Sequence, residues 1–400
     1  MKYAIIVPDG MADQPIPDLG GRTPLEAART TNMDHMAQNG MQGLVPTIPK
    51  GMHPGSEIGN LSLLGYRPES CFTGRAPLEA ANSGIQLADD EIAFRCNLVT
   101  LDHGEMKDYS AGHIGTEEAE KLIAALNDEI QEEGIRFYPG KSYRHLLILK
   151  VRNPREFAEI ACTPPHDILD KKYEPHLPKS KPALTLLKIM ERAEKILAEH
   201  EVNRVRLDLG ENPANAIWLW GQGTRPNLPL FKEKYGLDGG IISAVDLING
   251  IGRLIGLNVI DVPGITGYYD TNYRGKADYA IDCLRQNDFV YVHIEAPDEA
   301  GHNGDLEAKM SCIEKIDREI VGTFLNHFSG HADFRIMVLP DHPTPISLRT
   351  HTADPVPFVI YGKGVASDGS FEYNERSAKT PGILFRSGEE LMTYFTNPYL

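Results

Sequence analysis

Six side chains of metal-binding types come after apolar runs in three separated parts of the chain. The runs cover residues 3–8, 289–297 and 334–340. The side chains that follow them are Asp9, Asp298, His302, Asp341, His342 and His351. We expect Asp298 and His302 where a strand passes into a loop, and His351 on a later loop. Near-continuous apolar runs are typical of strands covered on both faces, as in a parallel sheet. Such sheets place their chemistry beyond the carboxyl ends of their strands, so we expect these six side chains to converge on one site.

The types of these side chains indicate which ions such a site would hold. Carboxylates together with imidazoles suit Mn²⁺, Zn²⁺ or, less well, Mg²⁺. The absence of a thiolate from the set disfavours a structural zinc site. A single histidine is more often a hydrogen-bonded core or loop residue than a ligand. The metal interpretation therefore rests on the whole set, because every member follows a predicted strand.

Ser56 lies in the segment 54–60, where a glycine turn precedes a predicted helix. A serine there is by motif alone an ordinary N-cap. The free N–H groups at a helix start also stabilise a phosphate or an alkoxide. A serine hydroxyl needs a base or a metal to become a good nucleophile, and the predicted metal site would supply one. The glycine-rich segment 220–225 matches neither a Walker nor a Rossmann fingerprint.

The composition limits the class of protein. A chain of 400 residues suggests two domains, and 41% hydrophobic residues suffice for a sizeable core. The net charge of -16 argues against nucleic-acid partners and an anionic membrane surface. The five cysteines are scattered without a CxxC pair, which favours reduced thiols. No signal-peptide or membrane-span pattern is present, so we expect a cytoplasmic protein; the oligomeric state stays open.

The order of predicted elements favours an α/β fold with an insertion. Strand and helix patterns alternate near both ends of the chain, as in a βαβ arrangement around residues 242–260, and residues 305–329 keep helical apolar spacing. The middle is mixed in texture and includes a stretch rich in proline and lysine. We therefore predict a core of residues 1–85 and 215–400, with a smaller inserted α+β domain at 86–214.

At this level of detail the sequence resembles a known family. The ordered series of Asp-Gly, Gly-Ser-Glu, Asp-x-x-x-His, Asp-His and a final His is similar to that of the alkaline phosphatase superfamily. Within it, the chain looks most like the cofactor-independent phosphoglycerate mutases of archaeal type. The likeness continues through residues 19–27, 65–68, 74–75, 221–227 and 354–357. It implies an alkaline-phosphatase-like core with a mostly parallel sheet between helices.

The resemblance also implies a cofactor and a reaction. Two divalent ions would be bound, with Mn²⁺ preferred and Zn²⁺ or Mg²⁺ as alternatives. One ion would be held by Asp298, His302 and His351. The other would be held by Asp9, Asp341, His342 and the oxygen of Ser56. Ser56 would then carry the phosphoryl group as phosphoserine while 3-phosphoglycerate and 2-phosphoglycerate interconvert.

The part of the chain that would bind the small phosphorylated substrate departs from the family pattern. Archaeal mutases tend to carry an arginine-rich segment where this chain has Tyr109, Ser110 and His113. Loss of guanidinium groups weakens the bidentate grip on phosphate or carboxylate. The candidate substrate-binding residues are Arg75, His113, Arg144 and Arg225.

Three alternatives to the mutase are open, and the first of them is favoured by this departure. A bacterial branch that resembles these mutases has been proposed to phosphorylate homoserine, and fewer arginines would fit a less anionic acceptor. A phosphomonoesterase would leave the phosphoserine open to water. A metal-binding module without catalysis would need no hydroxyl among its ligands, so Ser56 argues against it.

Overall fold

The computed structural model describes residues 1–397 of the chain. The chain forms two compact units, Met1–Phe72 with Leu228–Leu400, and Thr73–Asn227. The second unit extends beyond the predicted insertion of residues 86–214 at both ends. The reason is that α5 (Arg75–Asn82) packs on β3 (Glu91–Asp102) and that β7 (Ala216–Thr224) pairs with β3.

The first unit is built on a seven-stranded sheet in the order β2-β12-β11-β1-β10-β8-β9. Its strands are β1 (Lys2–Pro8), β2 (Met41–Val45), β8 (Gly239–Ile242), β9 (Asn258–Val259), β10 (Phe289–Ile294), β11 (Phe334–Val338) and β12 (Val356–Gly362). The pairs from β11 through β1, β10 and β8 to β9 are parallel, whereas β12 is antiparallel to both β11 and β2. This confirms the predicted α/β class with a mostly parallel sheet.

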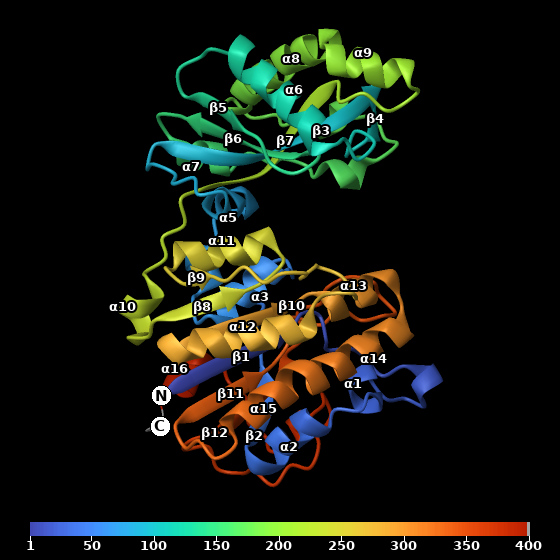
Figure 1. Ribbon diagram of the computed structural model, residues 1–400. Helices are drawn as coiled ribbons and strands as arrows, with labels where there is room; N and C mark the ends of the chain where they lie inside the picture. Colours follow the sequence, from blue (N-terminus) through green and yellow to red (C-terminus); the bar gives the residue numbers. More distant parts are fainter. Residues whose placement is uncertain (398–400) are drawn as a thin grey trace. The chain divides into compact units, whose positions relative to one another are not determined.

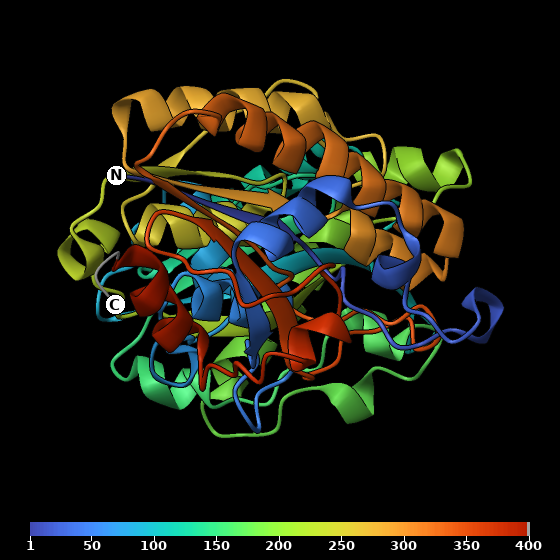
Figure 2. The same cartoon turned by 90° about the horizontal axis from the view of Figure 1, so that it is seen from below.

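Helices cover both faces of this sheet (Figures 1 and 2). The helices of this unit are α1 (Pro24–Ala27), α2 (Thr31–Asn39), α3 (Ser56–Leu63), α4 (Pro68–Cys71), α10 (Phe231–Tyr235), α11 (Asp246–Leu254), α12 (Tyr273–Gln286), α13 (Ala296–Asn303), α14 (Leu306–Lys315), α15 (Gly322–Phe328) and α16 (Gly388–Thr396). The helix predicted from the spacing of residues 305–329 is confirmed, with a π-helical turn at Ile316–Val321 between α14 and α15. In this turn Asp317 accepts hydrogen bonds from the backbone N–H groups of Asn32 and Met33 at the start of α2.

The core explains why the apolar runs became central strands. Side chains of β1, β10 and β11 such as Ile6, Val292 and Val338 are fully buried, and each contributes about 1.5–3 kcal/mol of burial free energy. Strand β1 lies between β10 and β11 in parallel register, with Ile6 opposite both Val292 and Val338. The residues that follow these three strands must therefore meet at one edge of the sheet.

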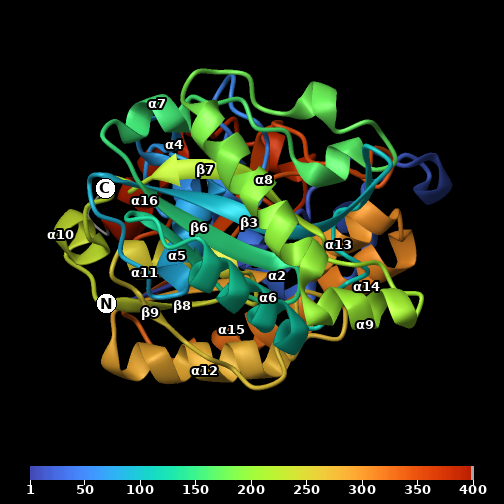
Figure 3. The same ribbon diagram turned by 90° about the horizontal axis from the view of Figure 1, so that it is seen from above.

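The second unit has an antiparallel sheet, which confirms the predicted α+β character of the insertion. Besides β3 and β7, it contains β4 (Glu105–Asp108), β5 (Ile135–Tyr138) and β6 (Arg144–Lys150). Its helices besides α5 are α6 (Thr116–Glu129), α7 (Pro154–Ala158), α8 (Ala183–Glu199) and α9 (Glu201–Asp208). Figures 1 and 3 show α6 and α8 on one face of this sheet. Within residues 1–397, none of the helices combines the length and apolar character that a membrane span requires.

Candidate metal centre

The carboxyl edge of the seven-stranded sheet gathers the predicted ligands. Asp9 directly follows β1, and the pair Asp341 and His342 follows β11. Asp298 and His302 come after β10, but on helix α13 rather than on the loop that we predicted. The helix does not separate them, because residues four apart lie on one helix face. His351 lies on the irregular segment before β12, as predicted.

Asp298, His302 and His351 form a first group of ligand atoms. His302 Nε2 lies 3.2 Å from Asp298 Oδ2, and His351 Nε2 lies 3.4 Å from Asp298 Oδ1. The Nε2 atoms of the two histidines are 2.8 Å apart. Burial raises the pKa of Asp298, but hydrogen bonds with the two imidazoles hold it well below its usual range. An ionised carboxylate facing two imidazole nitrogens is a donor set that suits a divalent cation.

Asp9, Asp341, His342 and Ser56 form a second group. His342 Nε2 lies 3.4 Å from Asp9 Oδ1 and 3.6 Å from Asp341 Oδ2. Ser56 Oγ lies 3.4 Å from Asp9 Oδ2 and 3.3 Å from His342 Nε2. Burial raises the pKa of Asp9 well above its usual range, and the charges of Asp341 and Asp298 raise it further.

One atom of the second group shows that these residues fit a cation. Among the described residues, no hydrogen-bond donor reaches the buried Oδ1 of Asp9. A buried carboxylate oxygen without a donor, close to two further carboxylates, is costly unless a positive charge compensates it. The two groups also adjoin, since ligand atoms of Asp298, His342 and His351 lie within 4.8 Å of one another. Together they form one centre with donors for more than one ion.

Ser56 is the first residue of α3, and its hydroxyl faces this centre. The N-cap is Gly55, which has no side chain to cap the helix, so the alternative in which Ser56 serves as an ordinary N-cap is wrong. The helix comes close to the centre because Gly59 has no side chain. A Cβ atom at Gly59 would lie 2.5 Å from the backbone oxygen of Asp341. The N-terminal end of α3 can therefore add its free N–H groups to the site.

The sequence analysis missed a buried polar cluster behind Asp9. It consists of Ser243, Lys276, His293 and Glu295. Burial lowers the pKa of His293, but hydrogen bonds with Asp9 and Glu295 raise it to about 10. Burial raises the pKa of Glu295, whereas Lys276 and His293 lower it below its usual range. A histidine within an otherwise apolar, fully buried strand and a glutamate directly after it were the signal that could have found this cluster, because such groups are rarely buried without a partner.

Two further buried residues support the first group of ligands. The hydroxyl of Thr344 donates a hydrogen bond of 2.5 Å to Asp298 Oδ1. Lys309 is fully buried and donates at 2.8 Å to both the backbone oxygen of Thr344 and Asp13 Oδ2. Hydrogen bonds of this kind orient ligands and set how strongly a metal is held.

In the second unit, Arg75 and Arg144 belong to one electrostatic cluster. Its centre is the ion pair of Arg95 and Glu79, with 3.1 Å between Arg95 Nε and Glu79 Oε2. Burial lowers the pKa of Arg95, the pair with Glu79 raises it, and the charges of Arg75 and Arg144 lower it. The guanidinium of Arg95 also lies 4.1 Å from the ring centre of Trp220. Guanidinium groups bind carboxylate and phosphate in a bidentate manner, so a cluster of three is of a kind that suits an anion.

The other predicted substrate residues are less closely gathered. Arg225 is exposed on the segment after β7. His113 is exposed, and its ring centre lies 6.0 Å from that of Tyr143, which also contacts Tyr109. Ser110 is buried, and its backbone N–H and hydroxyl both donate at 2.7 Å to Asp108. Of the three positions without arginine, Ser110 therefore serves local structure, while the other two join an aromatic group.

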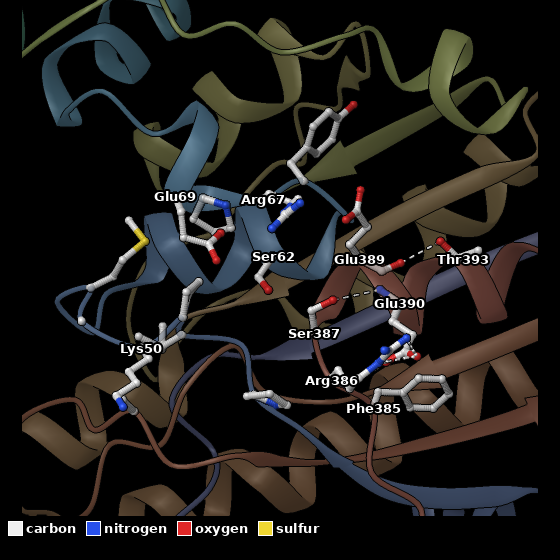
Figure 4. A pocket seen from close by; sticks show the side chains of 18 of the residues that line it. Lys50, Ser62, Arg67, Glu69, Phe385, Arg386, Ser387, Glu389, Glu390 and Thr393 are labelled. Atoms are coloured by element: carbon white, nitrogen blue, oxygen red, sulfur yellow. Dashed lines mark hydrogen bonds and ion pairs between the residues drawn. The ribbon is translucent and has the colours of Figure 1, made fainter.

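A separate cavity of about 1360 Å³ lies in the first unit between the loop before α3 and helix α16. Figure 4 shows its side chains, which include Lys50, Ser62, Arg67, Arg386 and Glu390. Arg386 is paired with Glu390 at 2.9 Å. None of the candidate ligands is among its described lining residues, so this cavity is not where the predicted chemistry takes place.

Fold and site together define a class: an α/β protein that collects carboxylates, imidazoles and one serine hydroxyl at the carboxyl edge of its sheet, in an arrangement suited to divalent metal ions. Residues 37–203 match the family described as 2,3-bisphosphoglycerate-independent phosphoglycerate mutase. The chain is 52% identical to the protein of that name from Methanosarcina acetivorans, over 98% of both chains. It is 47% identical to a probable mutase of the same name from Geobacter sulfurreducens, again over 98% of both chains. The chain belongs to the 2,3-bisphosphoglycerate-independent phosphoglycerate mutase family.

Solved structures share the complete fold. A protein of Pyrococcus horikoshii superposes with a TM-score of 0.82 at 29% identity, covering 100% of this chain and 98% of its own. The cofactor-independent phosphoglycerate mutase from Thermoplasma acidophilum superposes with a TM-score of 0.70, also at 29% identity, covering 99% of both chains. The resemblance to cofactor-independent phosphoglycerate mutases that was inferred from the motifs is thereby confirmed.

Proposed function

We propose that this chain interconverts 3-phosphoglycerate and 2-phosphoglycerate through a phosphoserine at Ser56. The observation that carries the proposal is the position of the Ser56 hydroxyl at the N-terminus of α3, 3.4 Å from Asp9 Oδ2 and 3.3 Å from His342 Nε2. The names of the curated relatives support the same reaction. They offer no support for homoserine as the acceptor, so only the mutase is proposed.

This chain would hold two divalent ions, for which Mn²⁺ is the preferred metal. One would bind to Asp298, His302 and His351, and the other to Asp9, Ser56, Asp341 and His342. When bound, such ions lower the pKa of a coordinated hydroxyl and neutralise charge on a phosphoryl group, which is worth several kcal/mol of barrier. The carboxylate and imidazole donors of the centre suit Mn²⁺, and Zn²⁺ or Mg²⁺ are the alternatives.

The reaction balances as two transfers of one phosphoryl group. The oxygen of Ser56 forms a bond to phosphorus while the bond from phosphorus to O3 of the substrate breaks, and the serine proton ends on O3 of glycerate. The 2-hydroxyl of glycerate then takes the phosphoryl group, and its proton returns to Ser56. Between the two steps water must be excluded, because hydrolysis of the phosphoserine would release inorganic phosphate.

The anionic groups of the substrate need cationic partners while glycerate reorients between the two transfers. We propose Arg75 and Arg144, with Arg95 as an additional member of their cluster, because guanidinium groups bind carboxylate and phosphate in a bidentate manner. His113 and Arg225 remain further candidates of this kind. We propose the cytoplasm as the compartment of the reaction; the five free cysteines support this, because a reducing compartment keeps thiols in that state.

The test is ³¹P NMR of the Mn²⁺-loaded protein with 3-phosphoglycerate and no nucleotide. The wild type is expected to form 2-phosphoglycerate, Ser56→Ala is expected to form none, and a chelator is expected to abolish the reaction until Mn²⁺ is restored. Ser62→Ala, on the same helix but lining the separate cavity, is the matched control and should behave as the wild type. Inorganic phosphate as the product would indicate a phosphatase. Turnover by Ser56→Ala would refute the phosphoserine.

A further inference from the structure

We propose that His293 is the positioning residue of Asp9: its ring bridges Glu295 and Asp9, holds one carboxylate oxygen of Asp9 and leaves the other for a metal ion, without being a ligand itself. This inference deepens the proposed function and rests on the two-ion centre described there. It concerns a residue of β10 that the motif series does not include.

The ring of His293 is enclosed between two carboxylates. His293 is fully buried. Its Nε2 lies 3.2 Å from Asp9 Oδ2, and its Nδ1 lies 3.2 Å from Glu295 Oε1. Both ring nitrogens therefore face an acceptor oxygen, and the question is which of them carries hydrogen.

A count of hydrogens on Asn60 answers this for Nε2. The amide nitrogen of Asn60 lies 3.4 Å from His293 Nε2, so it could in principle donate to that atom. Its two hydrogens, however, are directed to the backbone oxygen of Ser56 and to Asp341 Oδ2, both at 2.8 Å. No hydrogen of Asn60 remains for the imidazole. The partner left to Nε2 is the acceptor Asp9 Oδ2, so Nε2 is the donor in this contact.

By the same argument, Nδ1 is a donor to Glu295 Oε1. The hydroxyl of Ser243 donates its hydrogen to Glu295 Oε1 at 2.8 Å and so has none for the ring. Glu295 also accepts from the backbone N–H of Ala244 at 3.0 Å and from Lys276 at 3.1 Å. Lys276 in addition donates at 2.6 Å to the backbone oxygen of His293. The orientation of the His293 ring is thus fixed by Glu295, and the Glu295 carboxylate is itself fixed by hydrogen bonds from three other residues.

The two carboxylate oxygens of Asp9 therefore have different roles. Oδ2 accepts from His293, while no donor among the described residues reaches Oδ1, which faces His342. Fixing one oxygen prevents the carboxylate from rotating away from the ion that the other oxygen would bind. Ligand atoms of Asp9, His293 and Asp341 do lie within 4.8 Å of one another, yet the Nε2 hydrogen leaves the imidazole no lone pair toward Asp9, so this trio is not a third ion site.

Two substitutions at the same position separate the two ring nitrogens. The amide nitrogen of asparagine is placed as Nδ1 of histidine, and that of glutamine as Nε2. His293→Asn therefore removes the donor to Asp9, and His293→Gln keeps it. The full chain is titrated with Mn²⁺, and binding is monitored by calorimetry and by the EPR signal of free Mn²⁺. These measurements give the stoichiometry and the affinity of each ion.

We expect His293→Asn to weaken one of two ions by about 10- to 100-fold, the usual effect of losing a residue that orients a ligand. His293→Gln should stay within about threefold of the wild type on the same reasoning. His145→Gln, which replaces a buried histidine of the second unit, is the control and should bind both ions normally. If His293→Asn does not fold, as judged by circular dichroism, Glu295→Gln replaces it and should weaken the same ion.

The outcomes distinguish this inference from the function on which it rests. A wild type that binds no divalent ion would overturn the metal centre itself. Two ions in the wild type with unchanged affinities in both His293 variants would overturn only the positioning role, as would equal losses in the two variants. Loss of a coordinated nitrogen from the pulsed EPR spectrum of ¹⁵N-histidine-labelled, Mn²⁺-loaded protein on His293→Gln would show that His293 is a ligand.

Discussion

Replacement of Lys309 by methionine should strongly destabilise the first unit. Lys309 is fully buried on α14, and its ammonium group donates to Asp13 Oδ2 and to the backbone oxygen of Thr344. Asp13 is buried too, and its Oδ2 also accepts from the backbone N–H of Ile346. Methionine fills a similar volume but leaves Asp13 as a buried carboxylate without its counter-ion.

The magnitude follows from the burial of both partners. Removal of one partner of a buried ion pair costs about 3–5 kcal/mol, because the remaining charge has no compensation. In a unit of this size, a loss of 1 kcal/mol lowers Tm by about 2–4 °C. Lys309→Met should therefore lower the Tm of the first unit by roughly 6–20 °C. Asp13→Asn together with Lys309→Met should cost less than the sum of the single changes by about 2 kcal/mol or more.

The assay is urea unfolding with chelator present, so that bound metal does not add to the measured stability. Circular dichroism follows the transition of the wild type, the two single variants and the double variant. Lys195→Met is the control, because this lysine is exposed in an i,i+4 pair with Glu191 and such pairs contribute only about 0.3–0.5 kcal/mol. A loss below about 1 kcal/mol for Lys309→Met, or additive single effects, would refute the reasoning.

Three further predictions follow from individual contacts. Thr344→Val removes the hydroxyl that donates to a candidate ligand carboxylate; Mn²⁺ titration should show about 10- to 100-fold weaker binding, whereas Thr344→Ser should bind normally. Gly59→Ala brings a Cβ atom to 2.5 Å from the backbone oxygen of Asp341 and should cost roughly 1–3 kcal/mol in urea unfolding; Gly267→Ala, with no atom within 4 Å of the new Cβ, is the comparison, and equal losses would contradict the steric argument. Burial lowers the pKa of His145 to about 4, so the unfolded chain binds a proton at higher pH than the folded one. Stability should fall as the pH drops from about 6.5 toward 4, by up to about 3 kcal/mol in total, and His145→Gln should flatten the unfolding profile in that window.

Predictions from the sequence were most successful where one physical signal was sufficient. Apolar runs such as 289–294 identified buried strands, because only a parallel sheet covered on both faces accommodates them. The carboxylates and histidines after these runs meet in the structure, since β1 lies between β10 and β11. The position of Ser56 was also correct in outline, although its role as an ordinary N-cap could be rejected only from the contacts of its hydroxyl.

Other features required contacts that no local pattern contains. Residues 296–303 were predicted as a loop, whereas they form helix α13. Their polar residues obscure the apolar spacing of a helix, and tertiary packing rather than local pattern determines the structure here. The limits of the second unit depend on β7 pairing with β3, which is more than one hundred residues away in sequence. Arg95 was not predicted as a member of the arginine cluster. It lies within a buried strand, and its partner Glu79 comes from a different element, α5, so no local pattern indicates the ion pair.

By itself, the sequence determined the α/β class, the family and the set of residue types that a divalent metal centre needs, because strand periodicity and ordered motifs are local properties of the chain. Only the tertiary structure decided how these residues are used. It placed His293 and Glu295 behind Asp9 and left one oxygen of that carboxylate without a hydrogen-bond donor among residues 1–397. Such assignments depend on distances of a few ångströms between segments far apart in sequence, and these distances exist only once the strands have paired and the helices have packed on them.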